Sequence, residues 1–315
     1  MKTIILSTKN SHQDILNYGA DLLEELKKLS PTTTYDQVAT DFSNIPELFD
    51  TDEKLVMFNQ FSFPDGFSTF TQYLPQFKNI KFLLSPYSAY EGLDLELLKK
   101  MGIRYRNNGG ANAKSVAQYA VTTMFMLLSK IPVFTQKKVT PDGSIVGEEF
   151  HQKTAGIIGF GNVGRELATI LQGLGMPVVY YNRSTVKHSA KQVSFEEIFN
   201  QDIIFVTIAT NDETKQTLAK LPDLLQAKNY LIDISAAEDL YDKHRVVELL
   251  NQDKLRGYAL ELFDPSVDLK SEKNFIATPH IAWCTYDAEK RTIENYLNRA
   301  MKIIRGEIDT VDFIV

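Results

Sequence analysis

The sequence predicts an α/β protein built from two doubly wound, parallel-sheet domains, one Rossmann-like and one flavodoxin-like. Three observations support this prediction. The chain has 315 residues, which is too long for one ordinary hydrophobic core. Short apolar runs alternate with segments whose apolar residues have helical spacing. A glycine-rich turn of the dinucleotide-binding kind lies near the middle, at residues 159–164.

The first hundred residues alternate between expected strands and helices. Helical spacing covers residues 12–29 and 94–101. Such alternation predicts parallel βα units. The strand candidates are residues 3–7, 54–59, 81–85 and 103–106, with a weaker one at 35–39.

A long, mostly apolar helical pattern follows at residues 112–130. It has two interpretations: a core helix between the domains, or a helix buried against a second subunit. The βα alternation then resumes and ends with a helix over 288–305. Six strands at this spacing describe a doubly wound nucleotide-binding domain. They are expected at 154–158, 177–181, 203–208, 230–234, 257–262 and 275–278.

Composition and charge exclude several classes of protein. Apolar residues make up 43% and charged residues 23% of the chain, as in ordinary globular proteins. The net charge of −6 argues against nucleic acid or an anionic membrane as the main partner. No apolar run approaches the ~20 residues of a membrane span, and residues 1–7 turn polar too early for a signal peptide. The one cysteine, Cys284, excludes a cysteine-rich metal site. We therefore expect a cytoplasmic protein without a metal.

The glycine turn is the clearest functional motif. Gly159, Gly161 and Gly164 follow an apolar run and precede a helical pattern. In this setting the first glycine allows a tight turn, the second lets the backbone approach a pyrophosphate, and the third lets the helix pack on the strand. The pyrophosphate would bind at the helix N-terminus, beside Asn162 and Val163.

With this turn in place, the chain resembles the D-isomer-specific 2-hydroxyacid dehydrogenases. The resemblance implies a substrate domain of residues 1–103 plus 287–315, a central NAD(P)-binding domain of residues 104–286, and a homodimer. It rests on the glycine turn and on segments that follow the family's order: residues 112–119 (NAKSVAQY), 174–178 (LGMPV), 194–198 (SFEEI), 211–214 (NDET) and 278–283 (TPHIAW).

The resemblance implies hydride transfer between a nicotinamide and a small 2-keto or 2-hydroxy acid, or another small carbonyl compound. His280 would pass the matching proton. The substrate loop would contain Tyr87, Ser88 and Ala89. The cofactor would contact the glycine turn and further residues, namely Asn182, Arg183, Ser184, Ile208, Ala209, Thr214, Ser235, Ala236, Glu261 and His280.

Three positions depart from the family pattern. Ala236 occupies the position of the arginine that grips the substrate carboxylate, Ser266 that of the histidine's glutamate partner, and Glu261 that of an aspartate. The substrate loop also lacks the usual glycine near Ala89.

The missing arginine leaves three explanations open. Another cation replaces it, the substrate is not a 2-keto carboxylate, or the protein is a catalytically silent NAD(P)-binding sensor. The cations nearest in sequence are Lys243, His244 and Arg245.

The end of the second nucleotide-domain strand indicates the cofactor. NAD-specific domains place an acidic residue there to bind the ribose hydroxyls. Here Asn182 carries no charge that would repel a 2′-phosphate, while Arg183 and Ser184 can bind one. The sequence therefore favours NADP over NAD.

Overall fold

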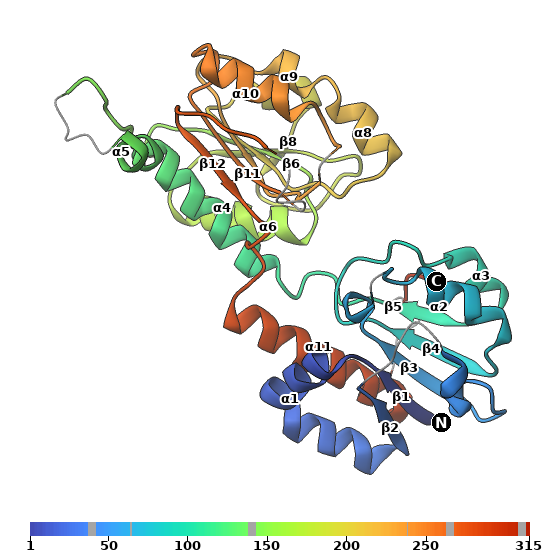
Figure 1. Cartoon of the computed structure of the whole chain (residues 1–315). Helices are drawn as coiled ribbons and strands as arrows, with labels where there is room; N and C mark the ends of the chain where they lie inside the picture. Colours follow the sequence, from blue (N-terminus) through green and yellow to red (C-terminus); the bar gives the residue numbers. More distant parts are fainter. Residues whose placement is uncertain (37–41, 64, 138–142, 238, 263–267, 308–312) are drawn as a thin grey trace. The chain divides into compact units, whose positions relative to one another are not determined.

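Two parallel sheets carry the fold (Figure 1). The computed structural model describes residues 1–36, 42–63, 65–137, 143–237, 239–262, 268–307 and 313–315. One unit comprises Met1–Asn112 and Tyr286–Val315, and the other Ala113–Thr285.

The first unit contains a five-stranded sheet with the order β2-β1-β3-β4-β5, which is flavodoxin-like. Its strands are β1 (Lys2–Leu6), β2 (Thr32–Tyr35), β3 (Lys54–Phe58), β4 (Ile80–Leu84) and β5 (Arg104–Arg106). Its α-helices are α1 (Lys9–Leu29), α2 (Ser68–Tyr73), α3 (Leu95–Lys100) and α11 (Tyr286–Arg305). Four 3₁₀ turns complete it: Phe42–Asn44, Pro46–Leu48, Gln60–Ser62 and Leu74–Gln76.

The expected strand at 35–39 overlaps the observed strand only at Tyr35. Strand β2 is formed by residues 32–35, and residues 37–41 lie outside the described part. The run of three threonines at 32–34 explains the difference, because β-branched side chains favour extended structure even where the segment is only half-buried.

Helices α1 and α11 come from opposite ends of the chain and pack together on one face of this sheet. Gly19 permits their close approach, because a Cβ atom there would lie 2.6 Å from Leu297 Cδ1. Helix α1 is kinked at Gly19, whose φ of −148° is non-helical. The two chain ends thus share one apolar core with Leu55 and Met57 of β3.

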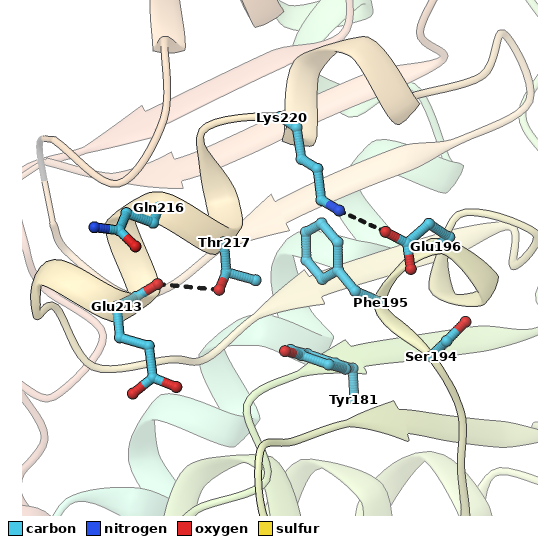
Figure 2. A pocket seen from close by; sticks show the side chains of 8 residues that line it. All are labelled: Tyr181, Ser194, Phe195, Glu196, Glu213, Gln216, Thr217 and Lys220. Atoms are coloured by element: carbon cyan, nitrogen blue, oxygen red, sulfur yellow. Dashed lines mark hydrogen bonds and ion pairs between the residues drawn. The ribbon is translucent and has the colours of Figure 1, made fainter.

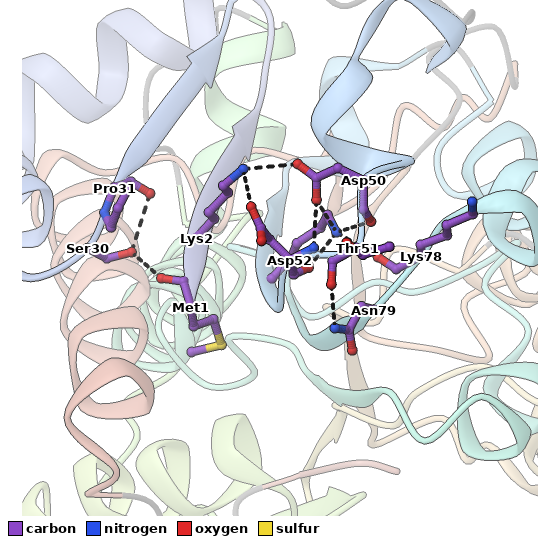
Figure 3. Close-up of polar contacts among 10 residues, drawn as sticks. Met1, Lys2, Ser30, Pro31, Asp50, Thr51, Asp52, Lys78 and Asn79 are labelled. Atoms are coloured by element: carbon purple, nitrogen blue, oxygen red, sulfur yellow. Dashed lines mark hydrogen bonds and ion pairs between the residues drawn. The ribbon is translucent and has the colours of Figure 1, made fainter.

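A fully buried lysine, Lys54, lies at the amino-terminal end of β3 and ties the neighbouring loops together. Lys54 Nζ donates to the carbonyl oxygens of Asp50 (2.9 Å), Asp52 (2.6 Å) and Lys78 (2.8 Å), and it pairs with the Asp50 carboxylate at 2.9 Å. Lys2 adds ion pairs to Asp50 and Asp52 (Figure 3). These hydrogen bonds keep the pKa of Asp50 far below its usual value.

The second unit contains a seven-stranded sheet with the order β12-β11-β10-β9-β6-β7-β8. From β6 the chain builds outward in one direction to β8 and then in the other from β9 to β12, which is the Rossmann arrangement. The strands are β6 (Ala155–Ile158), β7 (Val178–Tyr181), β8 (Lys191–Gln192), β9 (Ile203–Val206), β10 (Tyr230–Asp233), β11 (Gly257–Glu261) and β12 (Phe275–Thr278). The helices are α4 (Ala113–Leu128), α5 (Ile131–Lys137), α6 (Asn162–Gly173), α7 (Phe195–Ile198), α8 (Asp212–Leu218), α9 (Leu221–Leu224) and α10 (Lys243–Asn251).

The two predicted doubly wound domains are therefore confirmed. Both faces of the second sheet are buried, as parallel sheets require. Neighbouring strand residues such as Ile157 and Ile158 belong to apolar clusters on opposite faces. The short strand β8 was not predicted, because two partly exposed polar residues carry no apolar signal.

The division between the units falls later in the chain than the expected break after residue 103. That break would separate β5 from its own sheet, in which Phe82 pairs with Arg104. At the far end, Tyr286 starts α11 and belongs to the first unit.

The apolar pattern at 112–130 forms helix α4, which packs within the second unit against α6 and the sheet. The helix is thus part of the core of the second unit, while a place between the domains and burial against a second subunit both stay predictions. In the described ranges, no helix combines the length and apolarity that a membrane crossing requires.

Candidate active site

The glycine turn joins β6 to α6 at the point where the strand order reverses. Gly159 has a φ of +92°, and a Cβ atom on it would lie 2.9 Å from the Cα of Ile208. A Cβ atom on Gly164 would lie 2.3 Å from the carbonyl oxygen of Gly159. Gly161 differs from both, since its Cβ position is open. Two glycines therefore close the turn and the third leaves its backbone accessible.

The start of α6 can receive an anion. Gly161 is its N-cap residue and provides no side chain to accept from the first N–H groups. Asn162 is exposed and accepts a hydrogen bond from Arg165 at 2.8 Å, while Val163 packs partly on the core. Free N–H groups at a helix N-terminus suit a pyrophosphate. The residues present thus fit a dinucleotide.

Asn182 connects the end of β7 to this turn. Its side-chain oxygen accepts from the Phe160 N–H at 3.1 Å, and its amide nitrogen donates to the Ser184 carbonyl at 2.9 Å and the Ser184 hydroxyl at 3.2 Å. A carboxylate at this position would accept the first bond but could not donate the others. The asparagine therefore has a structural role that the sequence did not reveal.

Arg183 extends from the same loop and is strongly exposed. Its guanidinium forms an ion pair with Glu213 in the first turn of α8. Glu213 also lines an open hollow of about 580 Å³ (Figure 2). The hollow is lined by Tyr181, Ser194, Phe195, Glu196, Glu213, Gln216, Thr217 and Lys220.

The loop after β9 holds Ile208 and Ala209, and Thr214 lies in the first turn of α8 that follows it. Ile208 lies against Gly159, as described above. The Thr214 hydroxyl accepts from the Asn211 N–H at 2.8 Å and lies 2.9 Å from the Ala209 carbonyl, to which it can donate. Thr214 thus shapes this loop and caps α8.

The turn after β10 contains the position of the missing arginine. Ser235 donates its hydroxyl and its N–H to Asp233 Oδ1, at 2.6 and 2.9 Å. Asp233 is fully buried and also accepts from the Tyr241 hydroxyl at 2.6 Å. Ala236 follows with a φ of +54°, a region that is uncommon for residues other than glycine and marks local strain.

One of the three nearby cations lies close to this turn. Lys243 is 5% exposed and donates to the carbonyl of Ala237, the residue after Ala236. Arg245 is exposed and pairs with Glu248 at 3.0 Å, and His244 is exposed. Of the three, Lys243 has the position that could replace the arginine's charge.

His280 follows β12, the edge strand of the sheet. Its φ is +50°, so it shares the strained conformation of Ala236. The imidazole is half-buried, and this burial lowers its pKa below the ordinary value, against an opposing effect of the negative charge of Glu261. A neutral imidazole near physiological pH is suited to proton exchange.

Glu261, at the end of β11, holds the loop that carries His280. This carboxylate is 1% exposed. One oxygen accepts from the Thr278 hydroxyl at 2.6 Å and the Ile281 N–H at 3.1 Å, and the other from the Ala282 N–H at 2.8 Å. Both oxygens are therefore bonded within the protein, and the expected contact between Glu261 and the cofactor stays a prediction.

Helix α4 supports the same loop from a second side. The Tyr119 and Thr278 hydroxyl oxygens lie 2.5 Å apart, and Ser115 donates to the Ala282 carbonyl at 2.7 Å. Burial raises the pKa of Tyr119 to about 12, so it stays a neutral hydroxyl. Neither side chain was predicted to belong to the site, although both lie in the segment 112–119 that supports the family resemblance.

The expected substrate loop belongs to the first unit. The Ser88 and Ala89 carbonyls accept from Asn107 at 2.6 Å and from Gln60 at 2.7 Å. Tyr87 hydrogen-bonds to Glu289, and burial with the negative charges of Glu289 and Asp14 raises the pKa of Tyr87. Burial likewise raises the pKa values of both carboxyl groups.

Comparison with known proteins decides the family. Residues 121–282, more than half of the chain, match the model described as "D-isomer specific 2-hydroxyacid dehydrogenase, NAD binding domain". The chain belongs to the D-isomer-specific 2-hydroxyacid dehydrogenase family. It is thus a NAD(P)-dependent oxidoreductase, and the expectation of an enzyme is confirmed. Membership of this family does not favour the alternative of a catalytically silent NAD(P)-binding sensor.

Relatives of this dehydrogenase include the hydroxypyruvate reductase of Thermotoga maritima, 26% identical over 68% of this chain and 74% of the relative. The glyoxylate reductase of Thermococcus litoralis is 23% identical over 70% of this chain and 72% of the relative.

Two solved structures share the fold over the full length of both chains. An acyclic imino acid reductase in complex with NADPH and D-Arg has a TM-score of 0.77 at 20% identity. The NAD-complexed D-isomer specific 2-hydroxyacid dehydrogenase from Lactobacillus delbrueckii ssp. bulgaricus has a TM-score of 0.78 at 18% identity.

The sheet topology of the dehydrogenase brings most expected site residues to one edge of the second sheet. The residues of the glycine turn, the β7 end, the β9 loop and the turns after β10 and β12 all follow the carboxyl ends of parallel strands. Ligands of open α/β sheets bind at this edge. Ser266 lies outside the described residues, so the structure gives it no position. No group of three or more potential metal ligands occurs among the residues that the structure describes.

Proposed function

We propose that this dehydrogenase is an NADPH-preferring reductase of a small carbonyl compound, with His280 as the proton donor. One observation carries the proposal: an open glycine turn and a firmly held His280 lie at the same edge of one sheet. A protein that only bound a nucleotide would need the first feature and not the second.

Each group in the proposal has a definite role. Gly159 and Gly164 close the turn, and the N–H groups at the start of α6 hold the pyrophosphate. The nicotinamide, when bound, supplies the hydride. His280 in its protonated form donates the proton to the substrate oxygen, and Glu261 keeps the histidine loop in position.

The substrate is proposed to be a carbonyl or imine compound that needs no arginine clamp. Ala236 leaves the arginine position without a guanidinium. We propose that Tyr87, Ser88 and Ala89 contact the substrate. The side chains of Glu289 and Asp14 place negative charge beside Tyr87. Acidic side chains disfavour a carboxylate on the substrate and favour an amine or iminium group. The fold neighbour solved with D-Arg is an imino acid reductase, so imines belong in the test.

The proposed preference for NADPH rests on the end of β7. Asn182 replaces the acidic residue of NAD-specific domains, and Arg183 and Ser184 follow it. Isothermal titration calorimetry with NADPH and NADH tests the preference. Tighter binding of NADPH supports it, and equal or tighter binding of NADH refutes it.

We also propose a cytoplasmic homodimer that acts on small molecules, following the family resemblance. Sedimentation velocity gives the oligomeric state, and a monomer at micromolar concentration contradicts this part of the proposal.

Turnover assays with candidate substrates test the proposed reaction. NADPH oxidation is followed with 2-keto acids, aldehydes, ketones, and 2-keto acids mixed with ammonia. The proposal expects a substrate among the compounds without a required carboxylate clamp. Ordinary rates, about 1–10³ per second, with simple 2-keto acids would instead show that another cation, such as Lys243, does the arginine's work. Tight cofactor binding without turnover of any compound would overturn the proposal.

A further inference from the structure

The ion pair between Arg183 and Glu213 occupies the place where the two nicotinamide cofactors differ. We propose that Glu213 weakens the preference for NADP(H) over NAD(H), because it competes with the 2′-phosphate of NADP(H) for the Arg183 guanidinium. The inference rests on the proposed binding of a dinucleotide at the glycine turn. It adds a residue from α8 to a role that the end of β7 ordinarily fills alone.

The position of Arg183 follows from its neighbour. Asn182 accepts from the N–H of Phe160, which lies between the first two glycines of the turn. Because this hydrogen bond joins Asn182 to the glycine turn, Arg183 lies where the adenosine ribose of a bound dinucleotide is expected. The Arg183 side chain is 79% exposed and free to approach a ligand from solvent.

Glu213 reaches this place from a different element. It lies in the first turn of α8, whose N-terminus is fixed by the Asn211–Thr214 capping box. Its side chain is 57% exposed and pairs with Arg183. The structure thus supplies a carboxylate beside the end of β7, although the residue that follows the strand, Asn182, is uncharged.

Charge decides how the two cofactors compete with this pair. A 2′-phosphate is an anion that can hold the guanidinium in a bidentate contact, whereas Glu213 accepts from Arg183 Nη1 with one oxygen. It must displace Glu213 and then remain close to that negative charge. NADH has a neutral hydroxyl at this position and meets no such repulsion. Glu213 therefore reduces the affinity for NADPH more than the affinity for NADH.

The expected effect is modest, because the pair is exposed. Exposed ion pairs contribute little and exchange partners readily. Removal of the Glu213 charge should raise the ratio of NADPH affinity to NADH affinity by about three- to tenfold. The shift should decrease as salt is added, since solvent ions screen exposed charges.

The hollow in Figure 2 provides a matched control. Glu196 lines the same hollow and has the same 57% exposure, but it pairs with Lys220 instead of Arg183. Glu196→Gln thus removes an equal charge from the same surface without touching Arg183. If general charge alone mattered, the two substitutions would act alike.

Calorimetry tests the inference without any need for turnover. Dissociation constants for NADPH and NADH are measured for wild type, Glu213→Gln, Glu196→Gln, Arg183→Ala and the double variant Arg183→Ala/Glu213→Gln. We expect Glu213→Gln to raise the NADPH:NADH affinity ratio, Glu196→Gln to leave it near the wild-type value, and Glu213→Gln to add little once Arg183 is absent.

The outcomes separate this inference from the proposed function. A wild-type preference for NADH refutes the proposed cofactor, yet a rise of the ratio in Glu213→Gln would still support the role of Glu213. An unchanged ratio in Glu213→Gln, or an equal rise in Glu196→Gln, overturns the inference even if NADPH is preferred. Lack of binding of either nucleotide overturns both.

Discussion

The carboxylate of Glu261 accepts a hydrogen bond from the backbone N–H of Ala282 at 2.8 Å, two residues beyond His280. With the bonds to Thr278 and Ile281, this contact fixes the histidine loop on both sides of the imidazole. A buried side chain on the neighbouring strand thus helps to fix the position of His280.

Glu261→Gln should lower turnover and leave cofactor binding intact. The amide keeps one acceptor oxygen, but its NH₂ group must then face a backbone N–H, so at least one bond is lost. Displacement of a reacting group by about 1 Å can cost about 10²-fold in rate. We expect a fall in kcat of up to that size in steady-state assays.

Thr278→Val is the matched comparison, because it removes one of the three bonds while the carboxylate remains. It should have a smaller effect than Glu261→Gln. If Glu261→Gln instead weakens NADPH binding in proportion to its loss of turnover, Glu261 contacts the cofactor, as the sequence led us to expect.

His280→Ala should reduce turnover by a factor of ~10² to 10⁴ and spare cofactor affinity, since a proton donor acts mainly in the transition state. His244→Ala, at an exposed position on α10, serves as the control. A His280→Ala variant of wild-type activity would show that the histidine is structural.

The pH dependence of reduction should reflect the lowered pKa of His280. If protonated His280 donates in this direction, as proposed, kcat/KM falls as pH rises through its pKa. Since burial depresses that pKa, the fall should come below the ordinary histidine value of about 6.5. Loss of the Glu261 charge, which supports the protonated form, should move the break lower still. A break above 6.5 in wild type contradicts this assignment.

Ala236→Arg should shift activity toward 2-keto acids such as glyoxylate, hydroxypyruvate or pyruvate. A guanidinium there could form a bidentate contact with the substrate carboxylate. The backbone strain at φ +54° is already present with alanine, so arginine adds little to it. Ala236→Met provides similar length without charge and should not produce the shift. Specificity constants for keto acids and for the native substrate measure it.

Lys54→Met should destabilise the first unit strongly. The substitution leaves three carbonyl oxygens and the Asp50 carboxylate without their shared donor. Loss of one partner from a buried charged network costs roughly 3–5 kcal/mol. Lys2→Met, at a partly exposed position with the same acidic partners, should have a much smaller effect. Chemical denaturation of both variants gives the comparison, and equal stability would contradict the structural role of Lys54.

Local patterns in the sequence predicted the two sheets and the carboxyl edge where the site lies. The turn from Gly159 to Gly164 was predictable because its geometry depends on residues within one short segment. The roles of Asn182, Glu261 and Lys54 were not, because each depends on atoms supplied by distant segments. The sequence placed Glu261 at a cofactor position, and only the fold shows its carboxylate bonded to residues 278–282. Glu213 lies in the segment 211–214 that supports the family resemblance, but only the fold shows its side chain paired with Arg183.

The two chain ends that meet in the first unit impose an order on biosynthesis. The strands of its sheet leave the ribosome before the second unit, but α11 and residues 314–315, which hydrogen-bond with Tyr105, emerge after it. Until then the apolar face formed by Ile5, Leu55 and Met57 is covered by α1 without α11. The intervening 113–285 unit requires on the order of ten seconds or more of translation. The nucleotide-binding unit can therefore complete its folding first, while the N-terminal sheet passes through a period in which a chaperone would have an exposed surface to protect.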